Sequence, residues 1–132
     1  MRIRGLSEAH IQCQITDFLA LDGWRRLKTD PCSDRARGKG FGEKGMCDVL
    51  YIRYEERDGN GGLTPLANSH AQVLWIEHKK VGGKVSAHQE AWHRAERARG
   101  ALVVVATKDF EPSLDGFLLW YRRSGLLRRD GL

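Results

Sequence analysis

Residues 72–79 read QVLWIEHK, and this stretch indicates both the fold and a possible site. Aliphatic, β-branched and aromatic residues dominate it, which is typical of a β-strand. Successive side chains of a strand point to opposite faces, so Glu77 and Lys79 are predicted to share one face while His78 points to the other. A carboxylate and an ammonium group at the end of an apolar strand indicate either a salt bridge or a functional site.

A second strand is predicted over residues 48–54, DVLYIRY, and it opens with Asp48. The intervening residues 55–69 contain the turn-forming run Asp58-Gly-Asn-Gly-Gly62. If the two strands pair as a hairpin around this segment, Asp48 can lie beside Glu77. Two carboxylates at a sheet edge form a hard-oxygen site that suits Mg²⁺ or Mn²⁺. A neighbouring lysine could then position the water that attacks a phosphodiester.

The other elements are predicted from hydrophobic periodicity and capping residues. Serines precede three helical patterns and glycines follow them, while two further apolar stretches indicate strands. The helices are expected between Ser7 and Gly23, between Ser86 and Gly100 and between Ser113 and Gly125, with a short edge strand at 24–28 and a buried strand at 101–107. The order α-β-β-β-α-β-α predicts one α/β domain over residues 1–132, with helices flanking a mixed sheet.

The charge balance favours a polyanionic partner. Lys and Arg number 22 against 17 Asp and Glu, for a net charge of +5. That excess suits nucleic acid, although a solvated basic surface explains it equally well. No apolar run approaches the roughly 18–20 residues that span a bilayer, and the amino terminus lacks the apolar core of a secretory signal. We therefore expect a cytoplasmic protein.

The cysteines and histidines are scattered rather than paired. Cys13, Cys32 and Cys47 form no CxxC motif, and their odd number argues against a disulfide framework. His88 and His93 lie five residues apart on a predicted helix, which places them on different faces. We therefore expect no structural zinc site.

These motifs together resemble the PD-(D/E)XK nuclease signature, and the wider pattern is similar to the VRR-NUC (virus-type replication-repair nuclease) family. The resemblance covers residues 6–108 in the family's order of elements. It departs from the family at Cys47, where a proline is usual, and in the length of segment 55–69. The similar stretches are Ser7-Glu8, Gly45-Met-Cys-Asp48, Glu77-His-Lys79, Gly83-Lys-Val-Ser86 followed by Gln89, and the strand after Gly100.

The resemblance implies a restriction-endonuclease-like core, α-β-β-β-α-β with a C-terminal helix, and a Mg²⁺- or Mn²⁺-dependent endonuclease. Asp48 and Glu77 would bind the metal ion, and the main-chain carbonyl of His78 would be a third ligand. Lys79 would position the nucleophilic water.

Two further residues have roles in the family and also plain explanations as helix-capping residues. Glu8 would join the metal site directly or through water, yet any acid in a first helical turn favours the helix dipole. Gln89 would support Lys79 or the scissile phosphate, yet Ser86-x-x-Gln89 is a capping box. Both explanations stay open for each residue.

The resemblance also implies cleavage of branched DNA, such as Holliday junctions, by a homodimer acting in DNA repair in a bacterial or phage-infected cell. Basic residues of the loop at 29–45 and of the segment after the Glu77 strand could contact DNA phosphates. These are Arg35, Arg37, Lys39, Lys44, Lys80 and Lys84.

Apolar residues of the last helix could supply a dimer contact or pack into the core; they are Phe117, Leu118, Trp120 and Tyr121. The alternatives to a structure-selective nuclease are a non-catalytic nucleic-acid-binding module with a nuclease fold, and a restriction-type or nicking endonuclease. The absence of a separate recognition segment slightly disfavours the last of these.

Overall fold

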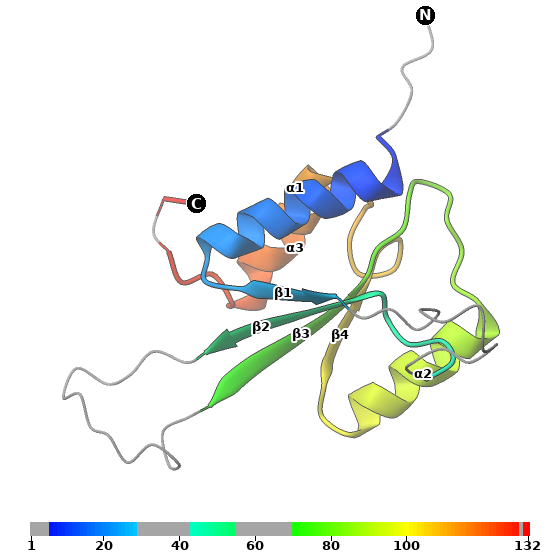
Figure 1. The fold of residues 1–132 in the computed structure, drawn as a ribbon. Coiled ribbons are helices and arrows are strands. Elements are labelled where there is room, and N and C mark those ends of the chain that lie inside the picture. The colour runs from blue at the N-terminus through cyan, green and yellow to red at the C-terminus, as the bar shows by residue number, and fades with distance from the viewer. Residues whose placement is uncertain (1–5, 29–42, 55–69, 130) are drawn as a thin grey trace, which may run out of the picture.

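The computed structural model describes residues 6–28, 43–54, 70–129 and 131–132. Within them a four-stranded mixed sheet carries two helices on one face and one on the other (Figure 1). The predicted order of elements is confirmed, and each boundary lies within two residues of the expected one. The elements are α1 (Glu8–Leu21), β1 (Arg25–Lys28), β2 (Val49–Tyr54), β3 (Ala71–Glu77), α2 (Ala87–Ala98), β4 (Leu102–Val105) and α3 (Leu114–Ser124).

The sheet has the strand order β1-β2-β3-β4, with β1, β2 and β3 antiparallel and β4 parallel to β3. A parallel pair needs a crossover connection, and α2 provides it. The register pairs Val49 with Ile76 and Glu77 with Val105. The start of β2 and the ends of β3 and β4 therefore meet at one edge of the sheet.

The alternation of side chains along β3 separates two apolar clusters. Leu74 and Ile76 are buried against α1 and α3, whereas Trp75 packs under α2. Trp75 meets Trp92 of α2 edge to face, with ring centroids 5.0 Å apart, an arrangement that aromatic pairs favour. Because Glu77 follows Trp75 by two positions, its carboxylate lies on the α2 side.

The capping serines act as predicted. The side chain of Ser7 accepts a hydrogen bond from the backbone N–H of His10, and Ser113 accepts one from Gly116. Gly125 ends α3 in the left-handed region, with a φ of 82°, where glycine is favoured because it has no Cβ. None of the helices in the described part of the chain is both long and apolar enough to cross a membrane.

The last helix belongs to the core. Phe117 and Tyr121 are fully buried, while Leu118 and Trp120 are partly buried against the same cluster. Core packing, one of the two roles open to these four residues, is therefore observed. The large apolar residue that α3 exposes is Leu119.

A buried polar network is centred on Asp22, the residue that follows α1. Arg53 of β2 is 2% exposed, and its Nη1 lies 3.0 Å from Asp22 Oδ2. The Tyr121 hydroxyl donates to the same carboxylate, and the backbone N–H of Arg129 donates to Asp22 Oδ1 at 2.8 Å. Asp22 therefore links the end of α1 to β2, α3 and the carboxyl-terminal segment.

Candidate active site

Four of the predicted site residues converge at one edge of the sheet. Asp48 immediately precedes β2, Glu77 is the last residue of β3, and Lys79 follows two positions later. The β2–β3 register, continued by one residue beyond the Val49–Ile76 pair, places Asp48 opposite Glu77. Gln89 joins them from the first turn of α2.

Three of these side chains form a closed triangle of contacts. Gln89 Nε2 donates a hydrogen bond of 2.7 Å to Glu77 Oε1, and Lys79 Nζ lies 3.3 Å from the same oxygen. Lys79 Nζ also donates to Gln89 Oε1 at 3.3 Å. Glu77 is wholly buried, whereas the side chain of Lys79 retains 16% of its exposure. The lysine is thus held by two partners but still reaches the surface.

Gln89 caps α2 and also contacts the charged pair of Glu77 and Lys79. The side-chain carbonyl of Gln89 accepts a hydrogen bond of 2.9 Å from the backbone N–H of Ser86. The backbone N–H of Gln89 donates in return to Ser86 Oγ, which completes the capping box. The same amide group contacts Glu77 and Lys79. One residue therefore starts α2 and positions the charged pair.

Burial and the charge of Asp48 both disfavour the ionisation of Glu77. Burial raises the pKa of Glu77 to about 7, the negative charge of Asp48 adds to the rise, and Lys79 opposes it. The side chain of Asp48 reaches solvent, yet its surroundings partly desolvate it and raise its pKa. The positive charge of Lys79 opposes this rise as well. A divalent cation between two such acids would reverse this effect. The carboxylates of Asp48 and Glu77 offer hard oxygen donors for such a cation.

Glu8 and His78 occupy more distant positions. Glu8 is half-buried in the first turn of α1, and its charge contributes to the raised pKa of Glu77. The imidazole of His78 lies on the opposite side of the sheet, where Tyr51 Oη is 3.1 Å from its Nε2. Burial lowers the pKa of His78 to about 3, so the ring is neutral at physiological pH. The imidazole of His78 is therefore directed away from Glu77 and Lys79.

Two residues beside Glu77 were not predicted as part of any site. Cys47, Glu77 and His93 each offer a donor atom, and these atoms lie within 4.8 Å of one another. The tertiary structure brings these donors together although cysteine and histidine are scattered along the sequence. The sequence contained one usable signal, because Gln89 and His93 are four residues apart and so share a face of α2.

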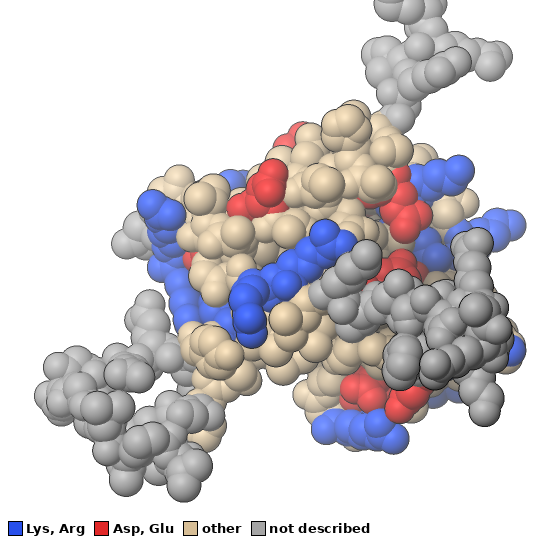
Figure 2. All heavy atoms as spheres, in the orientation of Figure 1, with Lys and Arg blue, Asp and Glu red and all other residues tan. Residues whose placement is uncertain are grey.

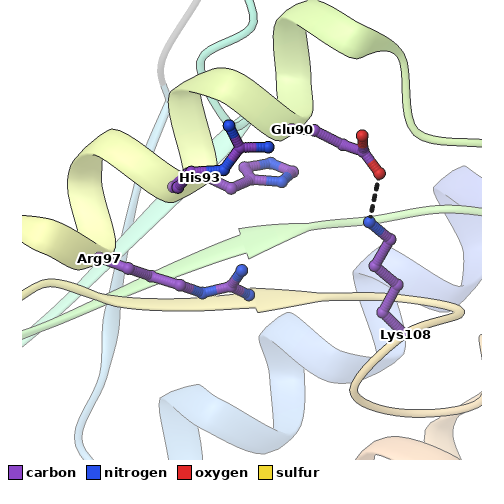
Figure 3. A pocket seen from close by; sticks show the side chains of 5 residues that line it. Glu90, His93, Arg97 and Lys108 are labelled. Atoms are coloured by element: carbon purple, nitrogen blue, oxygen red, sulfur yellow. Dashed lines mark hydrogen bonds and ion pairs between the residues drawn. The ribbon is translucent and has the colours of Figure 1, made fainter.

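A polar hollow is lined in part by His93 and lies between α2 and the segment after β4 (Figure 3). Its lining residues are Glu90, His93, Arg94, Arg97 and Lys108. Most of this charge is already engaged, because Lys108 Nζ pairs with Glu90 at 2.6 Å and Arg97 Nη2 donates to the Val103 carbonyl at 2.8 Å. The hollow is therefore a salt-bridged surface adjoining the site.

The basic residues expected to contact DNA are only partly within the described part of the chain. Lys44, Lys80 and Lys84 are exposed next to the site residues in sequence. Arg35, Arg37 and Lys39 lie outside the described residues. Figure 2 shows further basic side chains across the middle of one face, over β1, where Arg25 and Arg26 are exposed.

Comparisons with protein-family models, with curated proteins and with solved structures found no match to this chain. Its function is therefore inferred from the arrangement of its own residues.

Proposed function

We propose that this protein is a metal-dependent nuclease that hydrolyses DNA phosphodiester bonds. The observation that carries the proposal is the convergence of Asp48 with the Glu77–Lys79–Gln89 triangle at one sheet edge. A structural ion pair would explain Glu77 and Lys79 by themselves. It would gain no stability from Asp48, whose charge raises the pKa of Glu77. A second acid placed beside a buried carboxylate, at a cost in stability, is typical of functional sites.

Asp48 and Glu77 would hold the metal ion, with the His78 carbonyl and Glu8 as further ligands, Glu8 directly or through water. When bound, Mg²⁺ or Mn²⁺ supplies Lewis acidity at the phosphate and lowers the pKa of a coordinated water. The raised pKa of Glu77 is consistent with this function, because a nearby cation would stabilise the ionised form of its carboxylate.

Lys79 would act on the nucleophile. Its ammonium group is fixed by Glu77 and Gln89 at the edge where the two acids meet, and it remains partly exposed. From there it can hold the attacking water and stabilise the negative charge that develops on the phosphate oxygens. Gln89 would keep the ammonium group in place, so it is a positioning residue.

Exposed lysines would contact the DNA backbone. Lys44, Lys80 and Lys84 flank the site residues, and contacts of this kind fix the position of the nucleic acid without selecting its sequence. We therefore propose selection by DNA structure, such as a Holliday junction or another branch, and a homodimer to cut both strands. A non-catalytic nucleic-acid-binding module is the second candidate, favoured by the basic net charge.

A cleavage assay separates the two candidates. The protein is incubated with junction, flap, duplex and single-stranded DNA in Mg²⁺, in Mn²⁺ and in EDTA. We expect metal-dependent cleavage of branched DNA, lost in Asp48→Asn and Lys79→Ala while DNA binding persists. Asp17→Asn, which alters an exposed acid of α1, is the matched control and should cut normally. Binding without cleavage in either metal would establish the binding module instead.

A further inference from the structure

We propose that Cys47, Glu77 and His93 form a second cation site, selective for a thiophilic divalent ion of the Zn²⁺ type. Their donor atoms lie within 4.8 Å of one another, and all three residues are at most 2% exposed. This site goes beyond the proposed nuclease function, because Cys47 and His93 have no part in the hydrolysis.

Two of the donor atoms lack a hydrogen-bond partner. Glu77 Oε2 and His93 Nε2 are both buried without one, although they face each other at 3.9 Å. A buried polar atom left unsatisfied costs about 1–3 kcal/mol, and such atoms often mark a missing ion or water. A cation between the carboxylate and the imidazole would satisfy both.

The separation fits a tetrahedral ion. Zinc binds nitrogen and oxygen donors at about 2.0–2.2 Å, which places two ligands of one tetrahedral ion roughly 3.4 Å apart. The observed 3.9 Å between Glu77 Oε2 and His93 Nε2 needs to close by only a few tenths of an ångström. The distances from Cys47 Sγ to the other two donor atoms are at most 4.8 Å, so a small rotation of that side chain is enough to bring the sulfur to the same ion.

The donor types decide which ion is bound. Thiolate and imidazole favour Zn²⁺ and Co²⁺ and disfavour Mg²⁺, which prefers oxygen. On binding, the Cys47 thiol forms a sulfur–metal bond and releases its proton to solvent. The thiolate and the Glu77 carboxylate then carry two negative charges that balance the dication in a buried position. Three protein ligands leave a fourth position for water or another small ligand.

Glu77 belongs to both sites through different oxygens. Its Oε1 contacts Gln89 and Lys79, whereas its Oε2 faces His93. Asp48 and Lys79 serve only the proposed nuclease site, and Cys47 and His93 serve only the second site. Variants of these residues therefore distinguish the failure of one proposal from the failure of the other.

Cobalt(II) is the probe, because a thiolate ligand gives it a sulfur-to-metal charge-transfer band. The reduced, metal-free full chain is titrated with Co²⁺. We expect a saturable band at one equivalent, displaced by Zn²⁺ and unaffected by excess Mg²⁺. The band should persist in Asp48→Asn and in the double variant Cys13→Ser/Cys32→Ser, where Cys47 is the remaining thiol. This double variant tests Cys47 as a ligand without substituting it.

Ligand variants complete the test. Cys47→Ser should abolish the band, and His93→Gln should weaken Co²⁺ binding by more than about 100-fold, beyond the 10–100-fold typical of an outer-shell partner. Circular dichroism checks that each variant is folded. The proposal is overturned if the wild-type chain shows no charge-transfer band, if the Cys13→Ser/Cys32→Ser variant loses it, or if folded His93→Gln binds Co²⁺ as tightly as wild type.

Discussion

Gln89 Nε2 donates a hydrogen bond of 2.7 Å to Glu77 Oε1 and so joins the first turn of α2 to the end of β3. The other end of the same amide accepts from the backbone of Ser86 and from Lys79 Nζ. The conformation that starts the helix is therefore also the one that holds the carboxylate and the ammonium group in place.

This double function can be divided with two substitutions. Ser86→Ala removes the hydroxyl that caps α2 but leaves the Gln89 amide on Glu77, so it should lower the free energy of unfolding by about 1 kcal/mol and leave cleavage unchanged. Gln89→Ala should cause a similar loss of stability and also reduce the cleavage rate by about 10–100-fold, as outer-shell partners typically do. Urea unfolding and single-turnover cleavage measure the two effects. Equal cleavage by both variants would leave Gln89 as a capping residue alone.

The raised pKa of Glu77 predicts a pH-dependent stability in the presence of EDTA. Its pKa is about 7 in the folded protein against 4.5 for the ordinary side chain, so the folded state binds the proton more tightly. The stabilisation is full below pH 4.5 and is lost as the pH rises to about 7. The difference between these two pKa values corresponds to a stabilisation of about 3 kcal/mol.

Glu77→Gln isolates this contribution, because glutamine does not titrate. The variant and the wild type should unfold at similar urea concentrations at pH 4.5, whereas the variant should be more stable at pH 8 by up to about 3 kcal/mol. Measuring the difference between the two proteins removes the contributions of the buried histidines. A difference that stays constant between pH 4.5 and pH 8 would contradict the raised pKa.

Gly45 positions the segment that carries Asp48. Its φ is +84°, and a Cβ at this position would lie 2.2 Å from the carbonyl oxygen of His88 at the start of α2. Gly45→Ala should therefore combine backbone strain of about 1–2 kcal/mol with overpacking of about 1–3 kcal/mol. It should also weaken cleavage, because relief of the clash separates Asp48 from α2.

Gly82 is the matched control for this substitution. Its φ is +80°, but nothing lies within 4 Å of the Cβ position. Gly82→Ala should show the strain of about 1–2 kcal/mol alone. Thermal or urea unfolding of both variants gives the steric contribution as the difference, and equal losses would mean that residue 45 does not pack against α2.

The buried pair of Asp22 and Arg53 should be far more sensitive than a surface pair. Asp22→Asn leaves the Arg53 guanidinium buried without its counter-charge, which should lower stability by about 3–5 kcal/mol. Glu96→Gln breaks the surface pair with Arg99, whose side chain is 69% exposed, and should lower stability by less than about 0.5 kcal/mol. Urea unfolding at neutral pH compares them. A loss below about 1 kcal/mol in Asp22→Asn would mean that solvent screens the pair.

The elements of this protein could be predicted locally. The serines at 7, 86 and 113 and the helical spacing of apolar residues mark the three helices of the described chain, because capping and amphipathicity act over a few residues. The position of Glu77 beside Lys79 required only the two-residue period of a strand. The position of Asp48 required only the antiparallel pairing of consecutive strands, which the structure confirms.

Contacts between distant elements could not be obtained in this way. Nothing in the sequence indicated that Arg53, near the end of a strand, is buried on Asp22, because that pairing depends on how α1 and α3 close over the sheet. In the same way, the apolar residues of the last helix suited either a core or an interface. Only the tertiary structure shows that Phe117 and Tyr121 are buried in the core against α1.

By itself the sequence determined the order of the elements and the set formed by Asp48, Glu77 and Lys79, since both follow from local periodicity and adjacent strands. Only the tertiary structure decided what surrounds the Glu77 carboxylate. The crossover through α2 brings Gln89 to one of its oxygens and His93 to the other, and the turn into β2 places Cys47 beside them. These neighbours are set by the packing of a helix on a sheet, which depends on contacts far apart in the chain.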